Sequence, residues 1–171
     1  MIRFDFEKSV GYWIFSTGHM LSRAMNEELS THGITYRQWE VLAWLSYHGE
    51  ITQSELAEQM RIEAPTLVGV IDRMERDGWI TRETDPCDRR KKIIRATDKV
   101  RPVWEQMVNC ALSVRARAIV GIPEEDLEVM RRTLSAMRDN MGENVLGPVP
   151  TNTLVAPTGP TKVSNATSPV D

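Results

Sequence analysis

Apolar residues recur at helical spacing along most of the first 142 residues of this 171-residue chain. The first apolar stripe consists of Val10, Trp13, Ile14, Leu21, Ala24 and Met25. It stops before Gly33, a residue type suited to the left-handed conformation that closes a helix. The pattern therefore predicts a long N-terminal helix that starts near Phe6 and ends near Gly33.

Two shorter helices are expected next. The first starts after Thr35, whose hydroxyl suits the N-cap position, and ends at Gly49. Thr52 and Glu55 have the spacing of a capping box, in which each side chain binds the backbone of the other residue. This spacing predicts a short helix to about Met60.

A fourth helix is predicted over residues 64–77, with a proline in its first turn, where the missing N–H costs no helical hydrogen bond. Leu67, Ile71 and Met74 share one face, which we expect to be buried. The opposite face is polar and partly basic: Pro65, Thr66, Gly69, Asp72, Arg73 and Arg76. Residues 79–97 then contain two β-prone runs around a basic turn, which predict a hairpin.

The C-terminal part of the pattern predicts two more helices. A long helix runs from about Thr97 to Val120, and we expect Pro102 to bend it, because proline lacks the N–H for one helical bond. The last helix carries Leu127, Met130, Leu134, Met137 and Met141 at alternating spacings of three and four. Together with the apolar stripe of the N-terminal helix, this apolar face favours a dimer interface. Packing within one chain is the alternative.

These elements predict a mainly α fold with a small β-hairpin wing, a winged helix-turn-helix flanked by N- and C-terminal dimerisation helices. The expected boundaries are residues 1–34 for the N-terminal dimerisation helix, 35–97 for the DNA-binding lobe and 98–142 for the C-terminal dimerisation helices. Residues 143–171 hold five of the nine prolines and no aromatic residue, so a disordered tail is expected there.

Charge is distributed unevenly along the chain. The formal net charge is −3, yet residues 61–101 contain eleven Lys and Arg against eight Asp and Glu. A locally basic segment in an acidic protein indicates a surface for a polyanion, and a solvated charged face is the alternative. With no metal-ligand spacing, Walker loop or other catalytic motif in the sequence, we expect neither an enzyme nor a cofactor.

In a winged helix-turn-helix, the helix before the hairpin enters the major groove of double-stranded DNA, and the hairpin reaches along the backbone. The predicted contacts on the recognition helix are Pro65, Thr66, Gly69, Arg73 and Arg76. Those on the wing are Arg82, Asp88, Arg89, Arg90, Lys91 and Lys92, and Arg95 is a further candidate for phosphate contact. We expect Asp88 to brace Arg90 at the wing tip.

At these residues the sequence resembles the MarR/SlyA family of bacterial transcription regulators. The resemblance covers about residues 8–142 and is carried by residues 53–57, 62–68 and 72–82 and by the Asp88-Arg89-Arg90 run; the 62–68 stretch and Pro102 are closest to the SlyA branch. It implies an obligate homodimer on a pseudo-palindromic operator. Two positions depart from the family pattern: Gly69 stands where an arginine is common, and Ala96 replaces a leucine. Base readout is therefore expected to rest on Arg73, Thr66 and the wing.

The resemblance also implies control by a small aromatic carboxylate bound between the dimerisation helices and the DNA-binding lobe. The candidate ligand residues are Trp13, His19, Arg23, Tyr36 and Trp39, with core packing as the alternative for the tryptophans.

Two other functions remain open. One is a redox-sensing regulator that uses Cys87, whose thiol stands beside basic residues in the wing, whereas Cys110 is expected to be a buried apolar residue. The other is a winged-helix module that binds only proteins. With two cysteines, no membrane-spanning run and no signal peptide, we expect a cytoplasmic protein.

Overall fold

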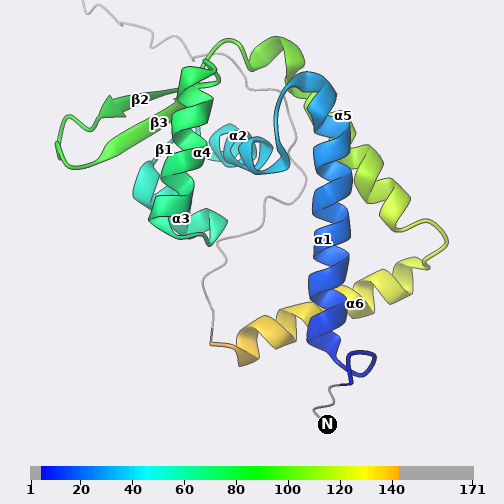
Figure 1. Ribbon diagram of the computed structural model, residues 1–171. Coiled ribbons are helices and arrows are strands. Elements are labelled where there is room, and N and C mark those ends of the chain that lie inside the picture. Colours follow the sequence, from blue (N-terminus) through cyan, green and yellow to red (C-terminus); the bar gives the residue numbers. More distant parts are fainter. Residues whose placement is uncertain (1–4, 143–171) are drawn as a thin grey trace, which may run out of the picture.

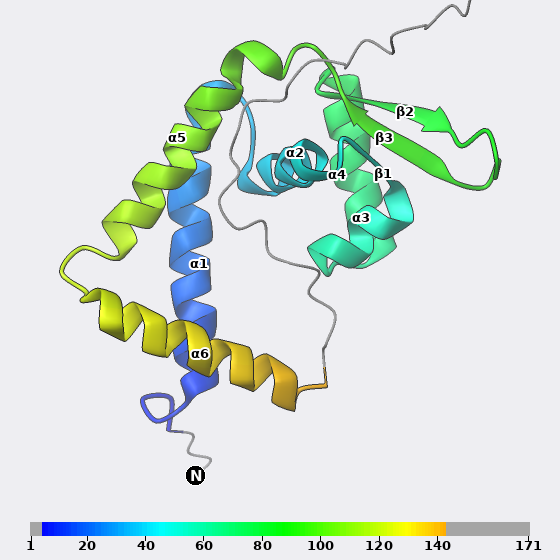
Figure 2. The same ribbon diagram turned by 180° about the vertical axis from the view of Figure 1, so that it is seen from behind.

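The computed structural model describes residues 5–142, so the predicted tail at residues 143–171 lies outside the described residues. Figure 1 shows two parts: a lobe made of short helices and a sheet, and an arm of long helices. The arm lies on one side of the lobe, and the β-hairpin projects from the opposite side, as Figure 2 shows from behind. The hairpin is thus free of the long helices.

The elements follow one another in the predicted order. They are α1 (Val10–Leu29), the 3-10 helix η1 (Ser30–His32), α2 (Tyr36–His48), β1 (Glu50–Thr52), α3 (Gln53–Met60), α4 (Ala64–Arg76), β2 (Ile80–Thr84), β3 (Lys92–Ala96), α5 (Arg101–Ala118) and α6 (Glu124–Asn140).

Local capping chemistry sets several helix ends. The Thr35 hydroxyl accepts a hydrogen bond from the Gln38 N–H, and the Gln38 side chain accepts one from the Thr35 N–H. Thr52 and Glu55 form the predicted capping box at the start of α3. Gly33 closes η1 in the left-handed conformation, with φ of 69°. These expectations from sequence are confirmed.

The sheet has one strand more than the predicted hairpin. β1 pairs with β3, so the antiparallel order is β1-β3-β2, and Ile51 lies opposite Ile94. Both isoleucines are buried. The expectation of a two-stranded sheet was incomplete because β1 is three residues long and its pairing partner lies more than 40 residues away.

The predicted bend at Pro102 is wrong. α5 begins at Arg101, so Pro102 lies in its first turn. The N–H groups of that turn have no partner within the helix in any case, so proline continues the helix there without interrupting it.

One hydrophobic core fills the lobe and extends under α1 and α5. Its fully buried large side chains are Leu29, Val41, Leu42, Leu56, Leu67, Ile71, Met74, Ile80, Ile94, Trp104 and Met107. Only the C-terminal end of α1 contributes to it, through Met25 and Leu29. Among residues 5–142, no helix is both long and apolar enough to cross a membrane.

Candidate nucleic-acid interface

Helix α4 has one buried face and one exposed face. Leu67, Val70, Ile71 and Met74 are buried against the core, as the spacing predicts for three of them. On the other side, Pro65, Thr66, Arg73 and Arg76 are exposed, and Gly69 is half-buried. The predicted recognition-helix residues are therefore brought together on one accessible surface.

Gly69 leaves its part of this surface to Arg73. A Cβ added to Gly69 would lie 3.7 Å from one guanidinium nitrogen of Arg73, an ordinary van der Waals contact. The Arg73 side chain thus runs back along the helix over the glycine, the direction that long helical side chains prefer. The Arg73 guanidinium therefore occupies the exposed face at this level of α4, and base readout by Arg73 stays a prediction.

The tip of the wing is organised by two aspartates. Asp85 accepts hydrogen bonds from the backbone N–H groups of Cys87, at 2.7 Å, and Asp88, at 3.2 Å. Asp88 in turn accepts from the backbone N–H of Arg90, at 3.1 Å, and from its Nε, at 3.3 Å. The predicted brace between Asp88 and Arg90 is confirmed.

Basic side chains surround this brace. Arg89, Arg90, Lys91 and Lys92 are all exposed, and 92% of the Arg90 side chain is accessible despite its contact with Asp88. The Lys92 ammonium donates to the Thr84 hydroxyl across the hairpin at 2.7 Å. The tip therefore presents a basic, partly ordered surface that suits a phosphate backbone.

Arg82 has a different environment from the other predicted wing contacts. Its guanidinium lies 2.7 Å from Asp72 and donates to Glu75 through Nε at 2.8 Å, so it joins β2 to α4. Hydrogen bonds from Arg82 lower the pKa of Glu75, and those to Glu75 and Asp72 raise the pKa of Arg82. Arg82 is thus paired within the lobe, and sequence reasoning missed its two carboxylate partners.

Arg95 is likewise paired with carboxylates of the lobe. It pairs with Glu50 on β1 and Glu83 on β2, one on each side of its own strand β3. Both hydrogen bonds raise the pKa of Arg95. Arg82 and Arg95 are thus neutralised by neighbouring carboxylates, whereas Arg89, Lys91 and Lys92 at the wing tip are exposed.

The segment after β3 is tied to the C-terminal end of α4. The Thr97 hydroxyl donates to the Gly78 carbonyl at 2.7 Å, and its N–H donates to the Trp79 carbonyl at 3.0 Å. Lys99 donates to the Asp77 carbonyl and lies over the Trp79 ring. The segment that leads into α5 is therefore hydrogen-bonded to the turn that follows the recognition helix.

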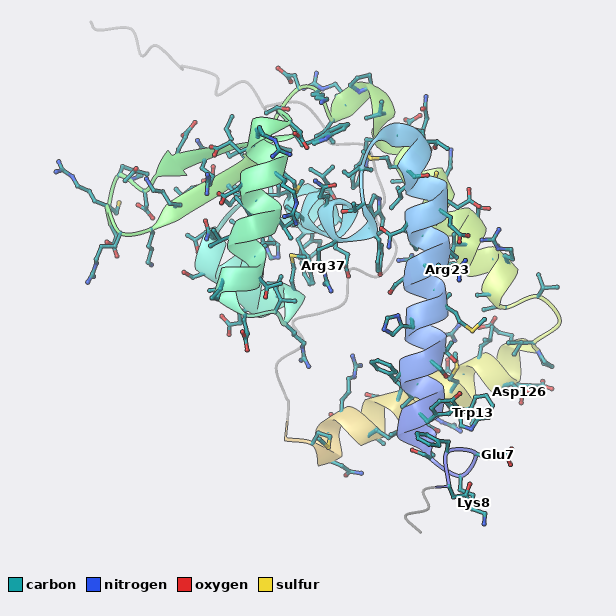
Figure 3. The ribbon with its side chains drawn as sticks, viewed as in Figure 1. Glu7, Lys8, Trp13, Arg23, Arg37 and Asp126 are labelled. Atoms are coloured by element: carbon teal, nitrogen blue, oxygen red, sulfur yellow. The ribbon has the colours of Figure 1, made fainter. Side chains whose placement is uncertain are left out.

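The five predicted ligand residues are not gathered into one site. Figure 3 shows Trp13 beside Glu7 at one end of α1, whereas Arg23 lies in the other half of that helix. His19 contacts the Phe15 ring, and Arg23 pairs with Glu27 at 3.0 Å. Tyr36 and Trp39 on α2 stack on each other at 6.0 Å between ring centroids, and Trp39 is buried.

The arm exposes many large apolar side chains. Phe15 and Met20 on α1 are 68% and 73% accessible. The full set on the arm helices and the turn after α5 is Val10, Tyr12, Trp13, Ile14, Phe15, Met20, Leu21, Leu112, Ile119, Val120, Ile122, Val129, Met130 and Leu134. So many exposed large apolar side chains favour an interaction surface on the arm.

The two cysteines have separate environments. Cys87 is exposed at the wing tip. Cys110 packs against the core from α5 but is only half-buried, less than the sequence predicted, and its Sγ lies 3.6 Å from Nε2 of His32. Burial and the nearby Glu28 raise the pKa of the Cys110 thiol. Among the described residues, no three His, Cys, Asp or Glu side chains form a cluster that could hold a metal ion.

Three short helices, the last followed by a β-hairpin with a basic tip, define a winged helix-turn-helix protein. The MarR family model matches residues 34–92, the segment that contains α2, α3, α4 and most of the hairpin. The chain is 29% identical over 115 residues to the uncharacterized HTH-type transcriptional regulator YwoH of Bacillus subtilis, covering 67% of this chain and 83% of that protein.

Solved structures show the same fold. A MarR-family transcriptional regulator from Rhodococcus sp. RHA1 superposes with a TM-score of 0.70 at 27% identity, covering 79% of this chain and 96% of that one. A mutant of E. coli MarR complexed with operator DNA has a TM-score of 0.70 at 22% identity, covering 75% and 92%. The chain is thus similar to MarR-family transcriptional regulators in the sequence of its winged-helix segment and in its fold.

Proposed function

We propose that the chain is a homodimeric, sequence-specific regulator that binds a pseudo-palindromic operator in the cytoplasm. Residues 35–97 form the DNA-binding lobe, with α4 in the major groove and the wing tip on the backbone and the adjacent minor groove. Residues 1–34 and 98–142 join two copies. A two-fold dimer reads two half-sites separated by about one helical turn of DNA, roughly 34 to 36 Å.

The observation that carries this proposal is the coexistence of two unlike surfaces on one protomer. The α4 face and wing tip are polar and basic, whereas the arm exposes apolar side chains such as Phe15, Met20 and Met130. A polyanion complements the first surface and a second copy of the arm complements the second. The structure of E. coli MarR on operator DNA supports this use of the fold.

The decisive experiment is selection from a random double-stranded DNA library by the purified protein, repeated over a salt series. We expect a palindromic site, and affinity that falls steeply with salt because counterions are released from each neutralised phosphate. A folded dimer that enriches no site would overturn sequence-specific binding and favour a module that binds proteins.

Two variants separate the roles of the recognition helix and the wing. Arg90→Ala should weaken binding to the selected site and to random duplexes alike, because it removes a contact with the DNA phosphate backbone. Arg73→Ala should relax discrimination at one base position by about 1 to 3 kcal/mol, the usual value of a bidentate contact with guanine.

Lys8→Ala is the matched control for these variants. It removes the same charge from an exposed side chain near the N-terminal end of the arm, where Lys8 pairs with Asp5 (Figure 3). The proposal would fail if Arg73→Ala left the selected sequence unchanged, or if Lys8→Ala weakened binding as much as Arg90→Ala.

We further propose that a small aromatic carboxylate modulates DNA binding. The support is the resemblance of the sequence to the MarR/SlyA family. Salicylate added to the selected complex should release DNA, and unchanged affinity at saturating salicylate would count against this effector class. Oxidation of Cys87 is the competing trigger, and peroxide sensitivity that Cys87→Ser abolishes would favour it.

A further inference from the structure

The loop at the wing tip, residues 85–91, buries its acidic side chains more deeply than its basic ones. Asp85 and Asp88 are half-buried, whereas Arg89, Arg90 and Lys91 are exposed. Residues 85–92 contain four Lys or Arg and two Asp, so acids within the loop offset half of its positive charge. A carboxylate repels phosphate, so each aspartate opposes DNA binding unless it also supports the cations around it.

The two aspartates differ in how they are paired. Asp88 contacts the Arg90 guanidinium, so its charge is offset directly. Among the residues that the structure describes, no cation forms an ion pair with Asp85. Its carboxylate is bound only by the backbone N–H groups of Cys87, at 2.7 Å, and Asp88, at 3.2 Å. The contribution of Asp85 is therefore to the shape of the loop.

Asp85 and Asp88 start two successive turns of the same kind. The Asp85 carboxylate accepts from the N–H two positions later, that of Cys87. The Asp88 carboxylate accepts in the same way from the N–H of Arg90. This side-chain contact is typical of turns that begin with aspartate. The second turn is closed by the Lys91 N–H, which donates to the Asp88 carbonyl at 2.9 Å.

The two turns are coupled because Asp88 belongs to both. One oxygen of Asp85 accepts from Cys87 and also from Asp88, and this second bond fixes where the next turn begins. The Asp85 N–H in turn donates to the Lys91 carbonyl at 3.1 Å, which ties the start of the first turn to the end of the second. Without the Asp85 carboxylate these N–H groups would bind water, and the loop would regain conformational entropy.

We propose that Asp85 is a positioning residue for DNA binding: its carboxylate orders the turn that carries Asp88, and Asp88 then holds Arg90 toward the DNA. This role rests on the DNA binding proposed above and adds a residue outside the predicted contacts. Asp85 thus has two opposite effects on affinity. As a hydrogen-bond acceptor it favours DNA binding, and as a negative charge it opposes it.

Two substitutions of Asp85 separate these effects. Asp85→Asn keeps a side-chain oxygen that can accept both N–H groups and removes the charge, so operator binding should strengthen by about threefold. Asp85→Ala removes the charge and the acceptor together. It should weaken binding by about tenfold, with a fall of about 1 in the salt slope because the phosphate contact of Arg90 is lost. Equal weakening by both substitutions would overturn the proposal.

Asp98→Asn is the matched control. Asp98 is an exposed acid between β3 and α5, at the opposite end of the hairpin from the tip. Its substitution should change operator affinity by less than about twofold, because distant exposed charges are screened by salt. Strengthening by Asp98→Asn as large as that by Asp85→Asn would mean that the effect follows net charge alone, and would overturn the assignment to the tip.

A double-mutant cycle tests whether Asp85 acts through Arg90. In the Arg90→Ala background, Asp85→Ala should weaken operator binding by less than about twofold, because the group that it positions is already absent. The same loss of about tenfold in both backgrounds would show that the two residues act independently, and would contradict the positioning role.

The order of the tip can be measured without DNA. NMR order parameters of the backbone amides of residues 87–90 should fall in Asp85→Ala and keep their wild-type values in Asp85→Asn, with urea unfolding as the check that the lobe is intact. Unchanged order parameters in Asp85→Ala would overturn the role of Asp85. Wild-type protein that binds no operator would instead overturn the function proposed above, and the order parameters would still decide whether Asp85 organises the tip.

Discussion

The lobe and the arm are built from helices with similar apolar periodicity, yet they bury it to very different extents. In α4 the stripe of Leu67, Ile71 and Met74 is completely inaccessible. In α6 the corresponding stripe leaves Met130 49% and Leu134 36% accessible, and Leu127 is its one buried residue within the described chain. Periodicity thus identifies an apolar face but does not identify what covers it.

Helix α1 contains the same contrast within one element. Its C-terminal residues Met25 and Leu29 belong to the core, whereas Phe15 and Met20 face outward. The boundary falls where α1 leaves the lobe and continues along the arm (Figure 1). We therefore expect substitutions in the two parts to have different consequences: in the lobe they change folding, and in the arm they change association.

The largest expected effect is on the lobe. Leu67→Ala removes a fully buried side chain from α4 and should lower the free energy of unfolding by about 2–5 kcal/mol, through lost burial and the cavity that remains. Hydrogen exchange of the α4 amides and urea unfolding would measure it. Phe15→Ala is the matched truncation in the arm and should leave α4 exchange nearly unchanged. Equal acceleration by both variants would contradict the distinction between lobe and arm.

The second effect is on association. Met130→Asp places a charge on the exposed apolar face of α6 and should raise the dissociation constant of the dimer at least tenfold, or about 1.4 kcal/mol. Sedimentation over a range of concentrations would measure it, with helix content as the check on folding. Arg132→Asp, two residues along the exposed helix, adds the same carboxylate on another face and should have a smaller effect. A dimer that tolerates Met130→Asp would place the interface elsewhere.

The features that sequence predicted well depend on neighbouring residues. The caps at Thr35 and Thr52 and the brace of Asp88 on Arg90 each involve residues two or three positions apart. The features it missed depend on the folded chain. β1 needs a partner in β3, and the pairing of Arg82 with Asp72 and Glu75 depends on how the hairpin lies against α4. A pocket beside Trp104 combines residues from two segments far apart in the sequence, 42–49 and 96–104, which no local pattern reveals.

A third prediction concerns the contact between the wing and α4. If Arg82 positions the wing through Asp72 and Glu75, Arg82→Ala and the Asp72→Asn, Glu75→Gln pair should weaken operator binding similarly. A variant that carries all three substitutions should bind the operator only slightly more weakly than either one, which corresponds to a coupling energy of about 0.5–3 kcal/mol. The salt dependence of binding should stay unchanged, because no phosphate contact is lost. A fall of about 1 in the salt slope for Arg82→Ala would instead make Arg82 a direct phosphate contact.

The smallest expected effect lies at the start of α3, in the lobe. Hydrogen bonds from the Thr52 hydroxyl and N–H lower the pKa of Glu55. Because the pKa is lower in the folded state, this contribution to stability is present above the unfolded value, about 4.3, and is lost as pH falls through the folded value. Thr52→Ala should lower the free energy of unfolding by about 1 kcal/mol at pH 7.

That loss should shrink as the pH falls through the folded pKa of Glu55, because protonation weakens its hydrogen bonds with Thr52. Urea unfolding between pH 7 and pH 3 measures this, with Glu58→Gln as the matched removal of a charge from the same helix. If Glu58→Gln flattened the acid dependence as much as Thr52→Ala, the capping box would not be its source. Because α3 belongs to the lobe, the acid effect should persist in the Met130→Asp variant, whose arm is expected to associate poorly.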